Sequence, residues 1–271
     1  YLGTTLDCNR EFTLIDCAIG SSQWGISEKA REIVLDHEMN QSYSSDPFYD
    51  QLLKPVILGR FNVPGLSPAN IFFGHGSFNL AERLIHKLIE PGIMLGVGPQ
   101  FNEIPSEFCA AGGEYIAVPI QGPQYDVPME ELLAHLSGGV SVLYIDNPNN
   151  PLGRLLELSE IEKLASEAER HGVIVIIDEA YGDFADDSHS SAHLVPMHRN
   201  LAVLRSCSKC LGLAAARIGY MFVSDELAEW YRPLDVPFEP SLASAILARE
   251  TLQDSGFITR VRQQTFETKS R

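Results

Sequence analysis

The sequence predicts an α/β protein whose mostly parallel sheet lies between two layers of helices, an α-β-α sandwich. Strand patterns alternate with helical patterns from about residue 65 to residue 223. The strand segments are continuous apolar runs, and residues 173–177 are β-branched throughout. Such runs are typical of strands that are buried on both faces. Their alternation with helices indicates a parallel sheet.

The elements follow one another along the chain, each with its own signal. Apolar residues recur at helical spacing over residues 80–89, until Pro91 ends the pattern. A second helix is expected to begin at a capping box in residues 159–162 and to end near Gly172. We expect buried strands at residues 93–95, 141–145, 173–177, 201–204 and 219–223.

The regions that flank this pattern divide the chain into three parts. Residues 1–40 are expected to form an N-terminal segment with a helix near residues 27–37. Residues 41–235 are expected to form the large domain. Residues 236–271 are mostly helical in pattern and are expected to begin a small C-terminal domain, most of which is missing from the chain.

Composition and charge exclude several classes of partner. The chain has 271 residues, is 45% hydrophobic and carries a formal net charge of −16, which describes a globular protein with a sizeable core. So much negative charge repels phosphate backbones, so nucleic acid and anionic membranes are not expected partners. No apolar run is long enough to span a bilayer, and no secretory signal is recognised.

Five scattered cysteines indicate free thiols in a reducing, cytoplasmic compartment. Cys207 and Cys210 form a C-x-x-C pattern, which is a weak sign of redox or metal chemistry. No second pair completes a zinc site. We therefore expect no metal, and we interpret both thiols as small buried residues on either side of Lys209.

Ligands of open α/β sheets bind at the carboxyl ends of the strands. Polar residues gather at four such places in the expected fold. These places are residues 74–79, 147–153, 178–181 and 206–209.

The last of these places carries the most reactive side chain. Lys209 follows an apolar strand and has poorly hydrated neighbours, so it differs from an ordinary surface lysine. A lysine in a partly buried site can act as an imine-forming nucleophile. Arg217 is suited to grip a phosphate with its planar fork of donors, and Ser206 and Ser208 add hydroxyl groups.

Three further places offer complementary groups. Asp178 either caps a helix or faces the positively charged nitrogen of a bound ring, and Tyr181 can reach the same ligand. Asn150 lies in a turn and can offer its amide to a phenolic oxygen. The Gly74–Phe78 stretch precedes a helix, whose N-terminus can bind a phosphate, and Phe101 is either a core aromatic or a stacking partner for a planar ring.

Together these residues resemble the fold-type I pyridoxal-phosphate enzymes, and most closely the histidinol-phosphate aminotransferase group of the class I and II aminotransferases. The resemblance rests on NPNNPLG at residues 147–153, DEAYGDF at residues 178–184 and NLAVLRSCSKCLGLAAARIGY at residues 200–220. Each motif is weak alone, whereas three in this order at strand ends form a specific pattern. Residues 41–235 are then the large pyridoxal-phosphate-binding domain.

The resemblance implies a role for each residue of the pattern. Lys209 forms the aldimine with pyridoxal 5′-phosphate and moves the substrate proton, Asp178 pairs with the ring nitrogen, and Asn150 and Tyr181 hold the ring oxygen. Phe101 stacks on the ring. The cofactor phosphate is held by Gly76, Ser77, Ser206, Ser208 and Arg217, and Phe78 is a further cofactor-binding residue. Tyr43 reaches across a homodimer interface to the neighbour's phosphate.

The implied reaction moves an amino group between an amino acid, or an amino-alcohol phosphate, and a 2-oxo acid. A decarboxylase of the threonine-phosphate decarboxylase type shares almost the same motifs, and a non-catalytic domain can retain the fold, so both alternatives stay open. The family's arginine for the substrate carboxylate belongs to the small domain, and no residue here is assigned to it.

Overall fold

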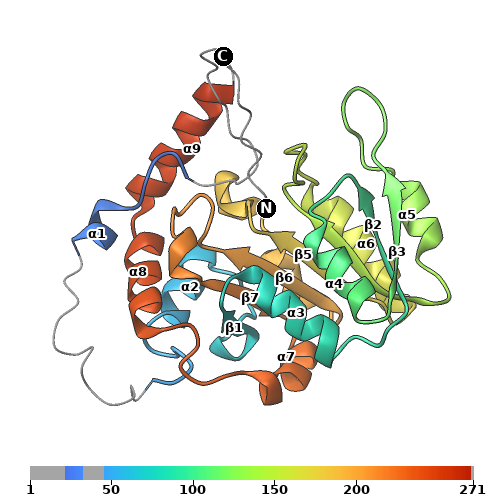
Figure 1. The fold of residues 1–271 in the computed structure, drawn as a ribbon, viewed down its shortest axis with the longest axis horizontal. Coiled ribbons are helices and arrows are strands. Elements are labelled where there is room, and N and C mark those ends of the chain that lie inside the picture. Colours follow the sequence, from blue (N-terminus) through green and yellow to red (C-terminus); the bar gives the residue numbers. More distant parts are fainter. Residues whose placement is uncertain (1–21, 33–45, 270–271) are drawn as a thin grey trace, which may run out of the picture.

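The computed structural model describes residues 22–32 and 46–269. In that part of the chain a seven-stranded sheet has the order β1-β7-β6-β5-β4-β2-β3 (Figure 1). Strands β6, β5, β4, β2 and β3 run parallel, and β7 runs antiparallel to its neighbours β6 and β1. The prediction of a mostly parallel sheet is therefore confirmed. The strands are β1 (Ile71–Gly74), β2 (Ile93–Gly98), β3 (Glu114–Pro119), β4 (Val140–Asp146), β5 (Ile174–Glu179), β6 (Leu201–Ser206) and β7 (Gly219–Val223).

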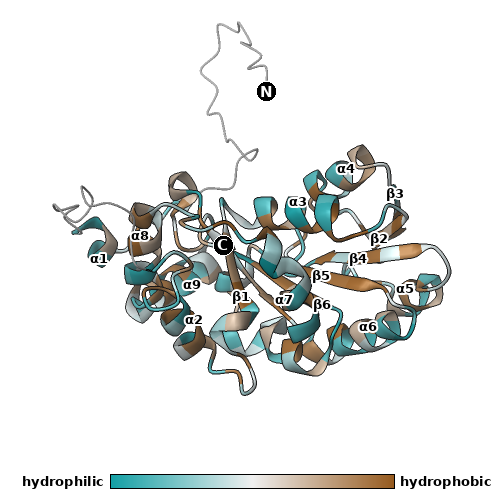
Figure 2. Cartoon of the chain, turned by 90° about the horizontal axis from the view of Figure 1, so that it is seen from below, coloured by the Kyte–Doolittle hydropathy of each residue, from teal (hydrophilic) through white to brown (hydrophobic). Residues whose placement is uncertain are grey.

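Helices cover both faces of the sheet, so the predicted α-β-α sandwich is also confirmed (Figures 1 and 2). One face packs against α3 (Ser77–Lys87), α4 (Glu103–Ala110) and α7 (Asp225–Tyr231). The other packs against α2 (Lys54–Phe61), α5 (Met129–His135), α6 (Leu158–Arg170), α8 (Leu242–Leu252) and α9 (Ser255–Lys269). Alternate residues of β4 serve the two cores, Val142 and Tyr144 the first, Leu143 and Ile145 the second.

Helix α6 shows how the local sequence sets an element and where the prediction was wrong. Its apolar residues recur every three or four positions, and Ile161, Leu164 and Ala168 are all buried against the sheet. The helix begins earlier than the predicted capping box, because Glu157 is its N-cap and donates its backbone N–H to the Glu160 carboxylate at 2.8 Å. The end of the helix near Gly172 is as predicted.

Five of the described α-helices and strands were not anticipated from the sequence. Strand β1 has only four residues, and β3 lies at the edge of the sheet, where most of its residues are partly exposed. Helices α2, α4 and α5 have seven or eight residues each, and α2 and α4 contain a proline. Such short elements carry too few periods of apolar residues to stand out.

The flanking regions are described in part. Helix α1 spans Glu28–Arg31 with Ser27 and Glu32 as its caps, and residues 33–37 of the predicted helix lie outside the described residues. The described residues after 235 form α8 and α9, whose Ala245, Leu252 and Val261 join the same core as the sheet. The predicted division of the chain into three parts stays a prediction. Among the helices that the structure describes, none is long and apolar enough to cross a bilayer.

Candidate active site

A cavity of about 280 Å³ lies at the edge of the sheet where β1, β2, β4, β5 and β6 end. Eleven of the twelve residues assigned to a site from the sequence line this cavity: Gly76, Ser77, Phe78, Phe101, Asn150, Asp178, Tyr181, Ser206, Ser208, Lys209 and Arg217. The twelfth, Tyr43, lies outside the described residues. The sheet therefore brings together side chains that are up to 141 positions apart in the sequence, from Gly76 to Arg217.

One end of the cavity is built for an anion. Helix α3 begins there at Ser77, and its N-cap Gly76 has no side chain that competes for the first-turn N–H groups. Arg217 lies beside them, donating to the His75 carbonyl at 3.2 Å and to Ser208 Oγ at 3.5 Å. Arg217 adopts a left-handed backbone with φ of 49°, which a residue other than glycine adopts only when its surroundings enforce it.

Two glycines make this anion end possible. A Cβ on Gly76 would lie 2.7 Å from an Arg217 guanidinium nitrogen, and its φ of +88° is one that other residues rarely adopt. Gly219 opens β7 beside the same turn, and a Cβ there would lie 2.4 Å from the backbone nitrogen of Ser77. The space at the helix N-terminus thus depends on the absence of two side chains.

Gly219→Ala is expected to lower the free energy of unfolding by about 1–3 kcal/mol, as measured by urea denaturation. The new methyl group would also meet the Gly76 carbonyl carbon at 2.6 Å, and backbone atoms cannot rotate away as a side chain can. Gly59→Ala in α2 is the control, because in the described part of the chain a Cβ there meets no atom within 4 Å. It should stabilise slightly, by about 0.5–1 kcal/mol, since alanine favours helix. Equal stability of Gly219→Ala and the native protein would show that the turn can move.

Another part of the cavity wall is acidic, with Asp146 and Asp178. Asp178 is buried near the end of β5, where it accepts hydrogen bonds from the Ala180 N–H at 2.9 Å and the Tyr144 hydroxyl at 3.2 Å. Burial raises the pKa of Asp178 to about 7, and the nearby Asp146 carboxylate adds to the rise, while the Ala180 N–H opposes it. Burial therefore disfavours the ionised form of Asp178, and a cation bound beside it would stabilise that form.

Lys209 and Tyr181 line the same cavity. Lys209 Nζ is 5.4 Å from the centroid of the Tyr181 ring. Burial raises the pKa of Tyr181, as does the negative charge of Asp178, so this hydroxyl stays a hydrogen-bond donor at neutral pH. Lys209 offers the amine of the cavity, and Tyr181 offers a neutral donor beside it.

The segment that carries Tyr181 is fixed by a buried ion network. Arg205, fully buried in β6, pairs with Glu179 at 2.9 Å on one side of Tyr181 and with Asp183 at 2.5 Å on the other. Arg60 of α2 adds a second pair to Asp183 at 2.6 Å. Each of these charges is buried and paired, and movement of one partner would leave another buried charge uncompensated. The network therefore holds the segment around Tyr181 in place.

The structure adds Asp146, Ala180 and Ala214 to the cavity wall. Sequence reasoning missed Asp146 because it reads as the last residue of a strand before a turn. Its position next to Asp178 follows from strand pairing, which sets these two residues side by side in β4 and β5. The only signal in the sequence was an acidic residue directly after an apolar run.

The cysteines on either side of Lys209 are structural in this fold. Cys207 and Cys210 are both buried and free, and burial raises the pKa of each thiol to about 12. A thiol with so high a pKa is a poor nucleophile and metal ligand. Among the residues that the structure describes, no group of three or more His, Cys, Asp or Glu side chains is placed to hold a metal ion.

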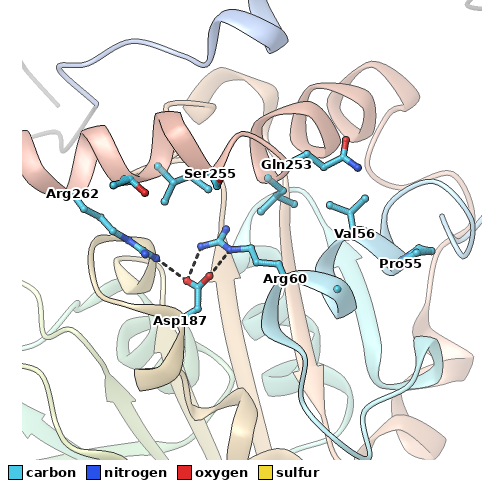
Figure 3. A pocket seen from close by; sticks show the side chains of 11 residues that line it. Pro55, Val56, Arg60, Asp187, Gln253, Ser255 and Arg262 are labelled. Carbon is cyan, nitrogen blue, oxygen red and sulfur yellow. Dashed lines mark hydrogen bonds and ion pairs between the residues drawn. The ribbon is translucent and has the colours of Figure 1, made fainter.

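A larger cavity of about 740 Å³ lies between α2 and the start of α9 (Figure 3). Its wall carries Asp187, which Arg60 contacts at 2.8 Å and Arg262 contacts at 2.7 Å. Although burial opposes ionisation, the hydrogen bond and the charge of Arg60 lower the pKa of Asp187 to about 2. These charged groups are neutralised by one another, so the smaller cavity around Lys209 is the better candidate.

Comparison with known proteins agrees with this geometry. The model of the family described as aminotransferase class I and II matches residues 29–271. A histidinol-phosphate aminotransferase of Pasteurella multocida is 30% identical over 253 residues, which cover 92% of this chain and 67% of that protein. One from Rubrobacter xylanophilus is 35% identical over 192 residues, covering 70% of this chain and 54% of that protein.

The fold of the chain also matches the fold of a solved structure. The histidinol-phosphate aminotransferase of Sinorhizobium meliloti, solved in complex with pyridoxal-5′-phosphate, superposes with a TM-score of 0.79 at 23% identity, covering 90% of this chain and 65% of that one. The chain thus spans about two thirds or less of the length of these proteins. The matched family model and the relatives show that the chain belongs to the class I and II aminotransferases.

Proposed function

We propose that the chain is the catalytic part of a pyridoxal-phosphate-dependent aminotransferase. It would move an amino group from an amino acid or an amino-alcohol phosphate to a 2-oxo acid. One observation carries the proposal: Lys209, Asp178, Asn150, Tyr181 and Arg217 line one cavity at the carboxyl edge of the sheet. Relatives named histidinol-phosphate aminotransferases support a phosphorylated amino alcohol as the first donor to test.

The cavity offers suitable groups for each part of pyridoxal phosphate. The first-turn N–H groups of α3 and the Arg217 guanidinium would hold the phosphate, and Gly76 and Gly219 leave the space that it needs. Asp178 would face the protonated ring nitrogen, which suits a buried carboxylate whose pKa is raised to about 7. Asn150 and Tyr181 would hold the ring oxygen, and Phe101 would cover the ring face.

When it is bound, pyridoxal phosphate supplies an electron sink for the bond that breaks at the substrate Cα. The protein's part is to bind, orient and move protons. Lys209 Nζ would hold the cofactor covalently and, once released by the amino donor, would carry the proton at Cα. A positioned base of this kind contributes roughly 10²–10⁴-fold in rate. Asp178 would keep the ring nitrogen protonated, and Tyr181 would donate to the ring oxygen.

The proposal extends to assembly and location. The resemblance of the loop around Tyr43 supports a homodimer in which each subunit completes the neighbour's phosphate site. The free thiols of Cys109, Cys207 and Cys210 support a reducing compartment, the cytoplasm. Sedimentation of the purified chain tests the first point, because a monomer at micromolar concentration would contradict it.

The test of function is a product assay on the native chain with added pyridoxal phosphate. Histidinol phosphate or a panel of amino acids is supplied with 2-oxoglutarate, and the products are identified by mass spectrometry. Formation of glutamate together with a carbonyl product is the expected result. Release of carbon dioxide without glutamate would assign the decarboxylase reaction instead. Covalent attachment of the cofactor without any turnover would favour a non-catalytic domain.

A further inference from the structure

Asp146 is the acidic residue of the cavity that has no role in the proposed reaction. It ends β4, is buried, and lies in register with Asp178 of β5. Both of its carboxylate oxygens accept hydrogen bonds. Oδ2 accepts from the backbone N–H of Phe101 at 3.0 Å and of Asn150 at 2.8 Å, and Oδ1 accepts from the Asn149 amide at 2.7 Å.

These three hydrogen bonds join two separate loops. Phe101 follows β2, whereas Asn149 and Asn150 follow β4. Asn149 strengthens the link, because its amide also donates to the Pro99 carbonyl at 3.0 Å and its oxygen accepts from the Leu152 N–H at 3.1 Å. A single carboxylate oxygen therefore sets the relative position of the Phe101 and Asn150 backbones, both of which carry side chains into the cavity wall.

We propose that Asp146 is a positioning residue for pyridoxal phosphate, which fixes the Phe101 and Asn150 loops relative to one another through its shared Oδ2. This inference rests on the proposed function, because it assigns Phe101 to the ring face and Asn150 to the ring oxygen. Hydrogen bonds that a carboxylate accepts from backbone N–H groups are stronger than neutral ones, so they suit a loop that must not move.

The charge of Asp146 has a second measurable effect, on the pKa of Asp178, which is independent of its hydrogen bonds to the loops. The ionisable groups that interact with Asp178 include Asp146 and Tyr144 on β4, Glu179 on β5, and Tyr181 in the following turn, and Lys209 lines the same cavity. The Asp146 carboxylate is among the causes that raise the pKa of Asp178. Any substitution that removes this charge should lower the pKa of Asp178, whatever it does to the loops.

The experiment compares Asp146→Ala and Asp146→Asn with the native protein in two measurements. The first is the dissociation constant of pyridoxal phosphate from absorbance titration. The second is the titration midpoint of Asp178 in the cofactor-free protein, followed by carboxyl ¹³C NMR and assigned with Asp178→Asn. Asp126→Asn is the matched control, because Asp126 is an exposed carboxylate paired only loosely with Arg154 at 3.7 Å.

Both Asp146 variants should lower the Asp178 midpoint alike, since both remove the charge, whereas their affinities should differ. Asp146→Ala removes the acceptor and should bind pyridoxal phosphate at least roughly tenfold more weakly. Asp146→Asn retains an oxygen for the two N–H groups but sets its amide nitrogen against that of Asn149, so a loss of roughly threefold is expected. The Asp126→Asn control should match the native protein in both measurements.

Two results would overturn the inference. Native affinity in Asp146→Ala would show that the hydrogen bonds of Asp146 are not needed for binding. Equal losses of affinity in the two variants would show that an acceptor oxygen at this position makes no difference. If Asp146→Ala does not fold, native affinity in Asp146→Asn would overturn it alone. Failure of the proposed function would give a different result. The native protein itself would then bind no pyridoxal phosphate, or would bind it away from Lys209.

Discussion

Replacement of Lys209 by alanine is expected to abolish covalent attachment of pyridoxal phosphate and to lower transamination on the order of 10⁴-fold. Lys209 supplies the amine of the cavity, with Nζ near the Tyr181 ring. The loss combines two functions of one side chain, covalent capture of the cofactor and proton transfer at the substrate Cα. The upper end of the range for a positioned acid or base is therefore expected.

The measurement is borohydride reduction of the protein with pyridoxal phosphate, followed by peptide mapping. In the native protein the reduced cofactor should be found on the peptide that contains Lys209. Lys163→Ala is the matched control, because Lys163 is exposed on α6 and outside the cavity. A reduced adduct on another peptide of the Lys209→Ala variant would place the attachment site elsewhere.

The affinity of the Lys209→Ala variant for pyridoxal phosphate distinguishes covalent attachment of the cofactor from its noncovalent binding. The phosphate end of the cavity, with Arg217 and the N-terminus of α3, is untouched by the substitution. Pyridoxal phosphate should therefore still bind, reversibly and without an adduct after borohydride. Complete loss of binding together with native stability would mean that the phosphate cradle contributes little by itself.

The strand-end rule explains why most of the site could be predicted from the sequence. Once strands were expected at residues 141–145, 173–177 and 201–204, the residues that follow them had to meet at one edge. Lys209, Asp178 and Asn150 were therefore placed together without knowledge of any contact. Family resemblance then added the roles, which the geometry alone does not give.

Residues that act through three-dimensional closeness could not be found in this way. Gly219 opens a strand on the antiparallel side of the sheet, and only the fold sets it against the backbone of Ser77. Asp146 reads as the last residue of a strand before a turn, and only the pairing of β4 with β5 sets it beside Asp178. Backbone space and strand register are properties of the assembled sheet, so no local pattern reports them.

Asp178→Asn is expected to lower transamination by roughly 10²–10³-fold while making the cofactor-free protein more stable at neutral pH. The loss of rate follows because a neutral amide cannot compensate the charge of a protonated ring nitrogen, and preorganised groups of this kind have effects of that size. The carboxamide keeps one oxygen for the Ala180 N–H, and its NH₂ group can donate to the Tyr144 hydroxyl oxygen, so the local structure should persist.

The gain in stability follows from the sign of the pKa shift. The pKa of Asp178 is raised from 3.8 to about 7 in the folded protein, chiefly by burial. The folded state therefore favours the protonated acid, and its contribution to stability is complete below the unfolded value of 3.8. That contribution is lost as the pH rises through about 7. The full loss corresponds to about 4 kcal/mol, because each pKa unit is about 1.4 kcal/mol.

Urea denaturation of both cofactor-free proteins between pH 5.5 and pH 8.5 tests this sign. The advantage of Asp178→Asn should grow from about 2 kcal/mol at pH 5.5 to about 4 kcal/mol at pH 8 and then level off. Pyridoxal phosphate should reverse the order, since only the native carboxylate gains a cationic partner on binding. A pH-independent difference between the two proteins would show that Asp178 is already ionised in the empty site, and near-native turnover of the variant would remove Asp178 from the reaction.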